Sequence, residues 1–362
     1  MSIVISVGEG IPKHRLTQQT SREFARQHFS SSFKDIDRLL QVFENGEIKS
    51  RFLVKELEWY KQDHSFPQKN NVFIEEAVEL GIKAIQNCLH AHSFLQSPIP
   101  YDDIDALFFI STTGIATPSI EARILNRLPF SKHVKRIPIW GLGCAGGAAG
   151  LARAHEFCRA YPDANVLILS VELCSLTFQK HDHSKSNLIG TSLFGDGAAC
   201  VLIAGEQSKI LTLSTNKTLP RVVGSRSILM KNSLDVMGWE LLESGLHVIF
   251  SRNIPSIIKK WLGPGVLAFL KSYQLTIEDI SHMIAHPGGK KVIDAYVQAL
   301  QLVNNMMTDT KEVLKEYGNM SSATIFFVLK RFLQKDIPRG EWGLATALGP
   351  GFSAELSLLQ WK

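Results

Sequence analysis

The sequence has few cysteines, and their distribution argues against two common roles. There are five, an odd number, and no two of them form a Cys-x-x-Cys pair. Disulfide frameworks usually have an even number of cysteines, and zinc sites usually have closely spaced ligands, so neither is expected. Reduced thiols indicate a cytoplasmic protein. Four of the cysteines lie in apolar helix or strand patterns and are expected to be small buried hydrophobic residues: Cys88, Cys158, Cys174 and Cys200.

Long apolar runs and dense charge of one sign are also missing. No stretch reaches the roughly 20 apolar residues that a membrane-spanning helix needs, and residues 1–8 are typical of a first β-strand rather than a signal peptide. The net charge is only +5, and no basic stripe is present, so we expect no nucleic-acid partner. Without a linker or low-complexity segment, the chain is predicted to share one core.

Sequence fingerprints of bound cofactors are absent as well. There is no Walker A motif, and no strand-linked GxGxxG run is followed by an acidic residue. The run His181-Asp182-His183 looks metal-like, but it has no third or fourth ligand at a suitable spacing. We therefore expect this run to be a loop, and we expect no metal and no cofactor.

What the sequence does contain is a faint internal repeat. A helical pattern at 75–89 is followed by a buried strand and a small-residue loop at 102–114, and the same order recurs at 266–273 and 277–289. The segments 195–203 and 349–359 also correspond, each a glycine turn followed by a strand. Alternating strands and helices predict an α/β fold. The repeat predicts two similar halves, 1–210 and 211–362, with a helical decoration at 17–68.

The most informative single residue is Cys144, within the glycine- and alanine-rich run 141–150. A strand-like segment, 136–140, precedes it, and a small-residue helix, 147–158, follows. The thiol is therefore predicted on a tight turn at a helix N-terminus. The helix dipole and free backbone N–H groups there stabilise an anion, so the pKa of this thiol is expected to fall. On this motif alone, a structural cysteine is the alternative.

Two further glycine-rich turns carry His286, in Ala-His-Pro-Gly-Gly, and Asn319, in Gly-Asn-Met-Ser-Ser-Ala. Each residue has an ordinary explanation by itself, a structural histidine at a strand end and a turn asparagine after glycine. Together with Cys144 they form the parts of an activated thiolate with an oxyanion hole. The combination favours catalysis.

In this order and at this spacing, the motifs resemble those of type III polyketide synthases, the chalcone-synthase-like branch of the thiolase superfamily. The resemblance implies a thiolase-like, five-layered αβαβα fold with two pseudo-duplicated halves, and a homodimer. It implies acyl-CoA and malonyl-CoA as substrates, Cys144 as the nucleophile, and His286 with Asn319 as the groups that activate malonyl-CoA. The matching segments span nearly the whole chain: 48–52, 141–147, 193–199, 286–289, 318–323 and 349–351.

The resemblance also suggests which residues meet the substrate. Phe194 is expected at the mouth of the catalytic cavity, and Thr177, Val248 and Ser321 around the acyl chain. Thr117 matches a position that the partner subunit contributes. Val248 and Thr117 are smaller than their counterparts in plant members, which favours a wide apolar pocket and a fatty acyl starter. The expected CoA contacts are Lys49, Arg51, Lys290 and Lys291.

We therefore expect a bacterial-type alkylpyrone synthase. It would join a medium- or long-chain acyl-CoA to malonyl-CoA by decarboxylative Claisen condensation and cyclise the product to alkylpyrones or alkylresorcinols. Three alternatives stay open. Ketoacyl-carrier-protein synthase III shares the Cys-His-Asn set, but has His-Gln-Ala-Asn where this chain has 286–289. A cysteine hydrolase would release free acid, and an inactive thiolase-fold scaffold subunit would typically have lost one of the three residues.

Overall fold

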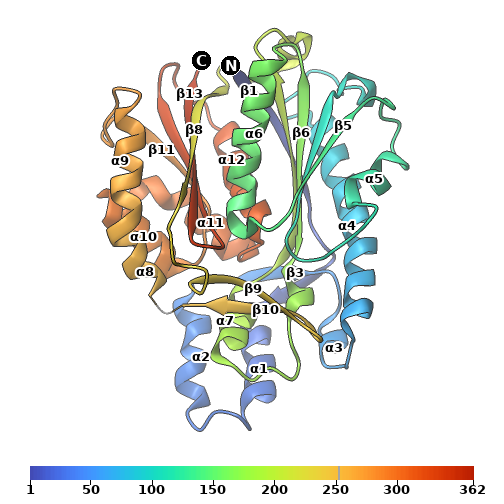
Figure 1. Ribbon diagram of the computed structural model, residues 1–362, viewed down its shortest axis with the longest axis vertical. Helices are drawn as coiled ribbons and strands as arrows, with labels where there is room; N and C mark the ends of the chain where they lie inside the picture. Colours follow the sequence, from blue (N-terminus) through green and yellow to red (C-terminus); the bar gives the residue numbers. More distant parts are fainter. Residues whose placement is uncertain (252) are drawn as a thin grey trace.

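A computed structural model gives the fold and describes residues 1–251 and 253–362. Within these ranges nine strands form one mixed sheet (Figure 1). In their order across the sheet the strands are β11 (Ile280–Ala285), β12 (Trp342–Gly349), β13 (Ser353–Trp361), β8 (Pro220–Leu229), β1 (Ser2–Gly10), β7 (Asp196–Gly205), β6 (Asn165–Leu173), β4 (Ala106–Ile110) and β5 (Lys135–Ile139).

The sheet consists of two halves with the same pairing pattern. In the first half β4 and β6 are parallel, and β6–β7 and β7–β1 are antiparallel. In the second half β11 and β12 are parallel, and β12–β13 and β13–β8 are antiparallel. Only two residue pairs in register, Ser2↔Val222 and Ile3↔Arg221, join β1 to β8. The predicted duplication is therefore present as two half-sheets that meet at one end.

Helices α6 (Gly146–Ala160) and α12 (Thr324–Leu333) lie between the two half-sheets (Figure 1). Helix α6 contacts β6 and β7 on one side and β8, β12 and β13 on the other. Helices α4 (Phe66–Leu89) and α5 (Ile120–Leu125) cover the first half-sheet from outside, and α9 (Gly263–Lys271) and α10 (Lys290–Leu300) cover the second. These layers give the expected five-layered αβαβα arrangement.

The two central helices approach each other closely because small residues line their contact. A Cβ atom at Gly147 would lie 2.3 Å from the Ser322 carbonyl oxygen and 2.6 Å from the Ile325 side chain. No side chain fits within that space, so glycine is required here. The alanine- and glycine-rich sequence after Cys144 thus sets the distance between the two halves at the centre of the molecule.

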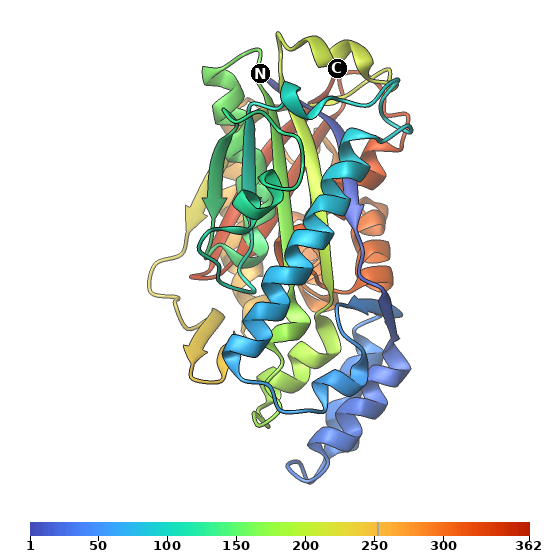
Figure 2. The same cartoon turned by 90° about the vertical axis from the view of Figure 1, so that its right-hand side faces the viewer.

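Most of the remaining elements gather at one end of the molecule, below the sheet in Figures 1 and 2, whereas α11 packs against α12 and β11, and α8 packs against α10. Helix α1 packs against α2 and α7, which confirms the predicted helical decoration. A hairpin of β9 and β10 lies beside α7. The elements not yet named are α1 (Gln18–Phe29), α2 (Ile36–Asn45), α3 (Leu57–Tyr60), α7 (Lys185–Leu193), α8 (Ile254–Ile257), α11 (Thr308–Tyr317), β2 (His14–Thr17), β3 (Ser50–Leu53), β9 (Met237–Leu242) and β10 (Gly245–Phe250).

The elements expected from local patterns are present. Residues 1–8 begin β1, residues 136–140 become β5, and the helix predicted at 147–158 is α6. The proposed boundary at 210/211 falls within a 3₁₀ turn, Lys209–Leu213, between β7 and β8. Among the described residues no helix has the length and apolarity to cross a bilayer. All five cysteines are free thiols, and the four predicted to be buried are buried.

Candidate active site

Cys144 lies on the 3₁₀ turn η2 (Gly143–Ala145), directly before the first residue of α6, as its glycine-rich surroundings predict. The residue is half-buried in the isolated chain, whereas the other four cysteines are buried. Side-chain hydrogen bonding from Ser321 and Asn319 acts on the thiol. The structure thus brings Cys144 together with Asn319 and Ser321, although they are more than 170 positions apart in sequence.

The pKa of the Cys144 thiol differs from the expectation. Burial raises it to about 11, and the nearby carboxylate of Glu172 adds to the rise. Hydrogen bonding from Ser321 and Asn319 lowers it, but by less than burial raises it. The expected fall is therefore wrong for this site without substrate, because desolvation of the thiolate outweighs the stabilisation available at the helix N-terminus. The thiol is neutral at pH 7 and loses its proton only when a base accepts it.

His286 follows the last residue of β11 and is only 2% exposed. Its backbone N–H donates to the Thr346 carbonyl of β12 over 2.8 Å, which fixes the backbone. Among the residues that the structure describes, neither ring nitrogen has a hydrogen-bond partner. Burial lowers the pKa of the imidazole to about 3, so the ring is neutral at pH 7. It therefore offers one N–H donor and one acceptor to a molecule in the site.

Asn319 connects three segments of the site. Its backbone N–H donates to the Leu193 carbonyl over 2.9 Å, and its carbonyl accepts from Gly195 over 3.0 Å, which places Phe194 beside it. Its side-chain oxygen accepts from the Ser321 N–H over 2.8 Å, and its amide nitrogen donates to the Gly288 carbonyl, 3.4 Å away, in the turn after the histidine. This geometry holds the amide next to the His286 turn.

The glycine before Asn319 is needed for this placement. Gly318 has φ +68°, and a Cβ atom there would lie 2.6 Å from the Arg51 side chain and 2.9 Å from the Leu193 carbonyl oxygen. Both the left-handed backbone and the close approach exclude a larger residue.

Sequence reasoning missed a buried carboxylate beside the thiol. Glu172, at the end of β6, is fully buried and accepts hydrogen bonds from the Thr112 N–H and the Thr113 hydroxyl, each 3.0 Å away. The Ser322 hydroxyl also donates to it. Burial raises the pKa of this carboxyl. An acidic residue within an apolar strand run was the available signal, since charged residues are rarely buried without partners.

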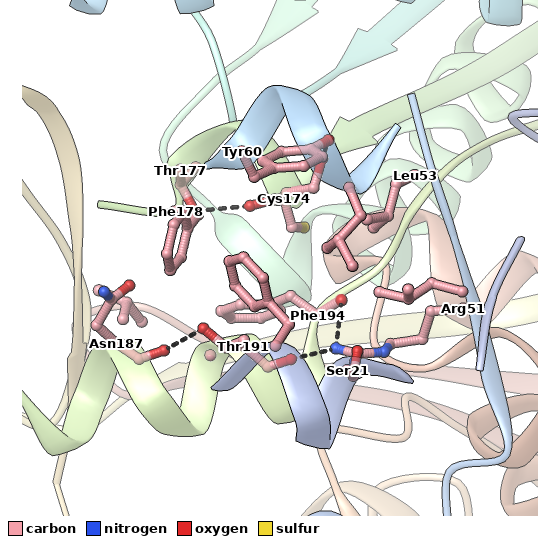
Figure 3. Close-up of a pocket in the computed structure, with 16 residues that line it drawn as sticks. Ser21, Arg51, Leu53, Tyr60, Cys174, Thr177, Phe178, Asn187, Thr191 and Phe194 are labelled. Carbon is pink, nitrogen blue, oxygen red and sulfur yellow. Dashed lines mark hydrogen bonds between the residues drawn. The ribbon is translucent and has the colours of Figure 1, made fainter. Parts of the chain in front are cut away.

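A largely apolar cavity lies between Phe194 and residues of α1 and α3 (Figure 3). Phe194, Thr177 and Val248 line it, as expected, and so does Cys174, which is buried against this cavity rather than in the core. A charge on Cys144 would raise the pKa of Cys174, so the cavity lies close to the nucleophile. Together with the adjoining open solvent, its space amounts to about 550 Å³.

The rings around Phe194 complete the entrance, and the sequence did not reveal them. Trp239 of β9 and Phe250 of β10 each have their ring centroid 5.7 Å from that of Phe194. Val248 pairs with Trp239 in the same hairpin. The β9–β10 hairpin therefore supplies one wall of the cavity.

With this geometry established, comparison with known proteins decides the family. Models of the N-terminal and C-terminal domains of chalcone and stilbene synthases match residues 1–207 and 222–361. The chain belongs to this family. It is an acyltransferase of the type III polyketide synthase class, whose members condense CoA thioesters with malonyl-CoA. The assignment favours the polyketide synthase over the ketoacyl-carrier-protein synthase III alternative.

Individual relatives cover the whole chain. A Bacillus subtilis (strain 168) protein named "Putative chalcone synthase" is 53% identical over all of this chain and 99% of its own length. The 1,3,6,8-tetrahydroxynaphthalene synthase of Streptomyces peucetius subsp. caesius is 35% identical over 99% of this chain and 93% of its own. The crystal structure of the Streptomyces coelicolor A3(2) enzyme of the same name superposes with a TM-score of 0.91 at 29% identity, covering 99% of each chain.

Apart from Arg51, the other residues expected to meet substrate, Ser321 included, are not among those that line the cavity beside Phe194. Thr117 is exposed and precedes a cis peptide bond to Pro118. Lys49 and Lys291 are exposed, which is compatible with a contact to CoA phosphate. Lys290 is already paired, since its ammonium nitrogen lies 3.0 Å from Asp294 and 3.6 Å from Glu47.

Arg51 does not fit the expected CoA contact. Its side chain is 2% exposed, and its guanidinium donates to the carbonyl oxygens of Thr191, at 2.6 Å, and Phe194, at 3.0 Å, and to the Ser21 hydroxyl (Figure 3). The expectation is wrong because the sequence shows that residue 51 is charged but does not show that its side chain is buried. In this synthase Arg51 instead holds the end of α7, from which Phe194 projects.

In the run His181-Asp182-His183, both histidines contact protein side chains. His181 lies 2.7 Å from Asp63, and the His183 ring stacks on His28 with centroids 5.4 Å apart. Over residues 1–251 and 253–362, no group of three or more candidate ligands is placed to hold a metal ion.

Replacing Arg51 with methionine tests its structural role. We expect Arg51→Met to lower the free energy of unfolding by about 3 kcal/mol, because buried carbonyls lose a charged donor. Urea unfolding measures this change. The matched variant Lys291→Met should leave unfolding unchanged and raise KM for CoA substrates. A normal free energy of unfolding together with a raised KM for CoA substrates in Arg51→Met would instead indicate that Arg51 contacts CoA.

Proposed function

We propose that this synthase extends a medium- or long-chain fatty acyl-CoA with malonyl-CoA and cyclises the product to an alkylpyrone or alkylresorcinol. The observation that carries the proposal is the largely apolar cavity lined by Phe194, Thr177 and Cys174. Its walls also include Phe24 of α1, Leu53 of β3 and Leu57 of α3. Each methylene that an acyl chain buries there contributes about 0.8 kcal/mol, which favours a long apolar starter over a polar one.

In the proposed first step, the sulfur of Cys144 attacks the carbonyl carbon of the starter thioester. Neutral His286, whose ring nitrogens have no protein partner among the described residues, accepts the thiol proton. CoA leaves as its thiol, taking up a proton, and the acyl group stays on the cysteine. General-base assistance is needed because the thiol is neutral in the resting site.

Malonyl-CoA then loses CO₂, and the electron pair of the broken C–C bond forms an enolate at its thioester. The N–H groups of His286 and Asn319 donate to the enolate oxygen, and such donors contribute ~3–4 kcal/mol each in other enzymes. The enolate carbon attacks the acyl carbon on Cys144, forms the new C–C bond and releases the cysteine sulfur. The β-ketoacyl-CoA returns for another round. Phe194, beside Asn319, would hold the malonyl group.

We also propose a homodimer. Strand β5 ends the sheet with exposed residues, and Trp140, the next residue, is 58% exposed. Ile115, near Thr117, is 42% exposed. A second copy that covers this edge would bury apolar side chains and pair the free backbone groups of β5. This supports the suggestion that Thr117 of one subunit reaches the cavity of the other.

Product analysis tests the activity. The purified protein is incubated with malonyl-CoA and acyl-CoAs from acetyl to stearoyl, and products are identified by mass spectrometry. We expect alkylpyrones or alkylresorcinols from the longer starters, and no product from Cys144→Ala. Formation of tetrahydroxynaphthalene from malonyl-CoA alone would indicate the activity for which the Streptomyces relatives are named. Free fatty acid alone would indicate a hydrolase, and unchanged products in Cys144→Ala would indicate that the thiol is not the nucleophile.

A larger side chain at position 248 should shorten the accepted starter. We expect Val248→Phe to lower kcat/KM for the longest acyl-CoA by about tenfold or more relative to hexanoyl-CoA, since two lost methylene contacts suffice. Leu241→Phe, on the exposed face of the same hairpin, is the control and should leave the ratio unchanged. An unchanged ratio in Val248→Phe would indicate that the acyl chain binds in another cavity.

The dimer is tested by sedimentation velocity. Trp140→Lys should shift the protein from dimer to monomer, because a charge would be buried at the contact. Leu267→Lys, 49% exposed on the outer helix α9, should remain dimeric. A wild-type monomer, or a Trp140 variant that stays dimeric, would contradict this interface.

A further inference from the structure

Tyr60, the last residue of α3, is a buried phenol that the mechanism above does not use. It is 6% exposed, and its hydroxyl lies 2.6 Å from the Ser175 hydroxyl. The Ser175 hydroxyl in turn donates to the buried carboxyl group of Asp196 over 2.5 Å. A serine hydroxyl has only one proton, so Tyr60 is the donor in its contact with Ser175. These two linked hydrogen bonds fix the phenol ring in one position.

Tyr60 and Phe178 lie between two spaces. Both line the largely apolar cavity that Phe194 borders, and so does Ser175, which binds the Tyr60 hydroxyl (Figure 3). Both also line a second pocket, which has a volume of about 230 Å³, is partly open to solvent and includes Trp59 in its walls. Residues that border two neighbouring spaces separate them, so we call the side chains of Tyr60 and Phe178 the partition.

The partition separates apolar surface from charge. Tyr60 belongs with Phe24 and Leu53 to a small buried apolar cluster, distinct from the cores of the two half-sheets. The second pocket, in contrast, is lined by the Asp63 carboxylate and the Lys180 ammonium, which lie 2.8 Å apart. An alkyl chain that entered this pocket would remove water from these groups without replacing its hydrogen bonds, which is unfavourable. An apolar chain is therefore expected to stop at the partition.

We propose that Tyr60 limits the length of the acyl starter, because its ring bounds the space that the acyl chain can fill. This inference rests on the proposed function, since it needs the acyl chain to lie in the cavity beside Phe194. The hydrogen bond to Ser175 holds the ring in place when a chain presses against it. A chain too long for the cavity has to displace this ring, so it reacts more slowly.

The experiment measures how fast Cys144 is acylated by acyl-CoAs from acetyl to stearoyl without malonyl-CoA, read from the intact mass of the protein. The limit is the longest acyl chain loaded at half the maximal rate or faster. The space that the ring vacates in Tyr60→Ala accommodates roughly two further methylenes, and each buried methylene contributes about fourfold. For the acyl-CoA two carbons beyond the wild-type limit, we therefore expect Tyr60→Ala to raise the loading rate about tenfold, relative to the acyl-CoA at that limit.

Trp59→Ala is the matched control. The Trp59 ring lies 5.0 Å from that of Tyr60, but it lines the second pocket, whereas the cavity residues of this segment are Leu57 and Tyr60. The limit in Trp59→Ala should therefore stay at the wild-type length. Tyr60→Phe keeps the ring and loses the hydrogen bond to Ser175, so it should shift the limit less than Tyr60→Ala does. Unfolding curves confirm that each variant is folded, and Tyr60→Leu replaces the alanine variant if that one is not.

Four results would overturn the proposal: an unchanged limit in the folded Tyr60→Ala or Tyr60→Leu variant, an equal shift in Trp59→Ala or Tyr60→Phe, equal loading of wild type by all chain lengths, or no loading of wild type and variants alike. A wild-type protein that loads only short acyl groups would contradict the fatty acyl starter. The role of Tyr60 would still predict a longer limit in Tyr60→Ala than in wild type, so the two failures are distinguishable.

Discussion

The close contact between α6 and α12 is the constraint on which the rest of the structure depends. Both helices are enclosed by the two half-sheets, and the absence of a side chain at Gly147 lets them touch. Cys144 lies two residues before α6, and Asn319 lies two residues before the turn that leads into α12, so this packing also sets where the sulfur and the amide meet. The nucleophile and the oxyanion donor thus lie near the starts of the two central helices, one from each half of the fold. A change in helix spacing would misplace both.

Burial explains the electrostatics of the site. The site contains the neutral thiol of Cys144, the neutral imidazole of His286 and the carboxyl of Glu172, whose pKa is raised by burial. A site of low charge binds an apolar acyl thioester without a large desolvation penalty. It also strengthens the donors of His286 and Asn319 when negative charge develops on a substrate oxygen, because little water screens them. Exclusion of water disfavours a free thiolate in the resting site, and for the same reason it favours the enolate step.

Local pattern predicted most of the fold and the three central residues. The runs around Cys144, His286 and Asn319 are set by turns and helix starts, which neighbouring residues determine, so the sequence shows them directly. Arg51 was misassigned and Glu172 missed because burial depends on segments far away in sequence, such as Ser21 and Ser322. The thiol pKa was wrong for the same reason, since a helix terminus can be read locally whereas desolvation cannot. Trp239 and Phe250 lie in a hairpin whose position against Phe194 is set by tertiary packing, so the local sequence does not reveal it.

The composition of the cavity follows from the elements that enclose it. The N-terminal decoration and the β9–β10 hairpin contribute aliphatic and aromatic side chains, so the space along Phe24 and Val248 is largely apolar. A fatty acyl chain that gains one keto group per extension becomes an amphipathic molecule with its polar end at Cys144. A largely apolar cavity matches the tail of that molecule, whereas the keto-bearing part, which must fold back to cyclise, stays at the cysteine.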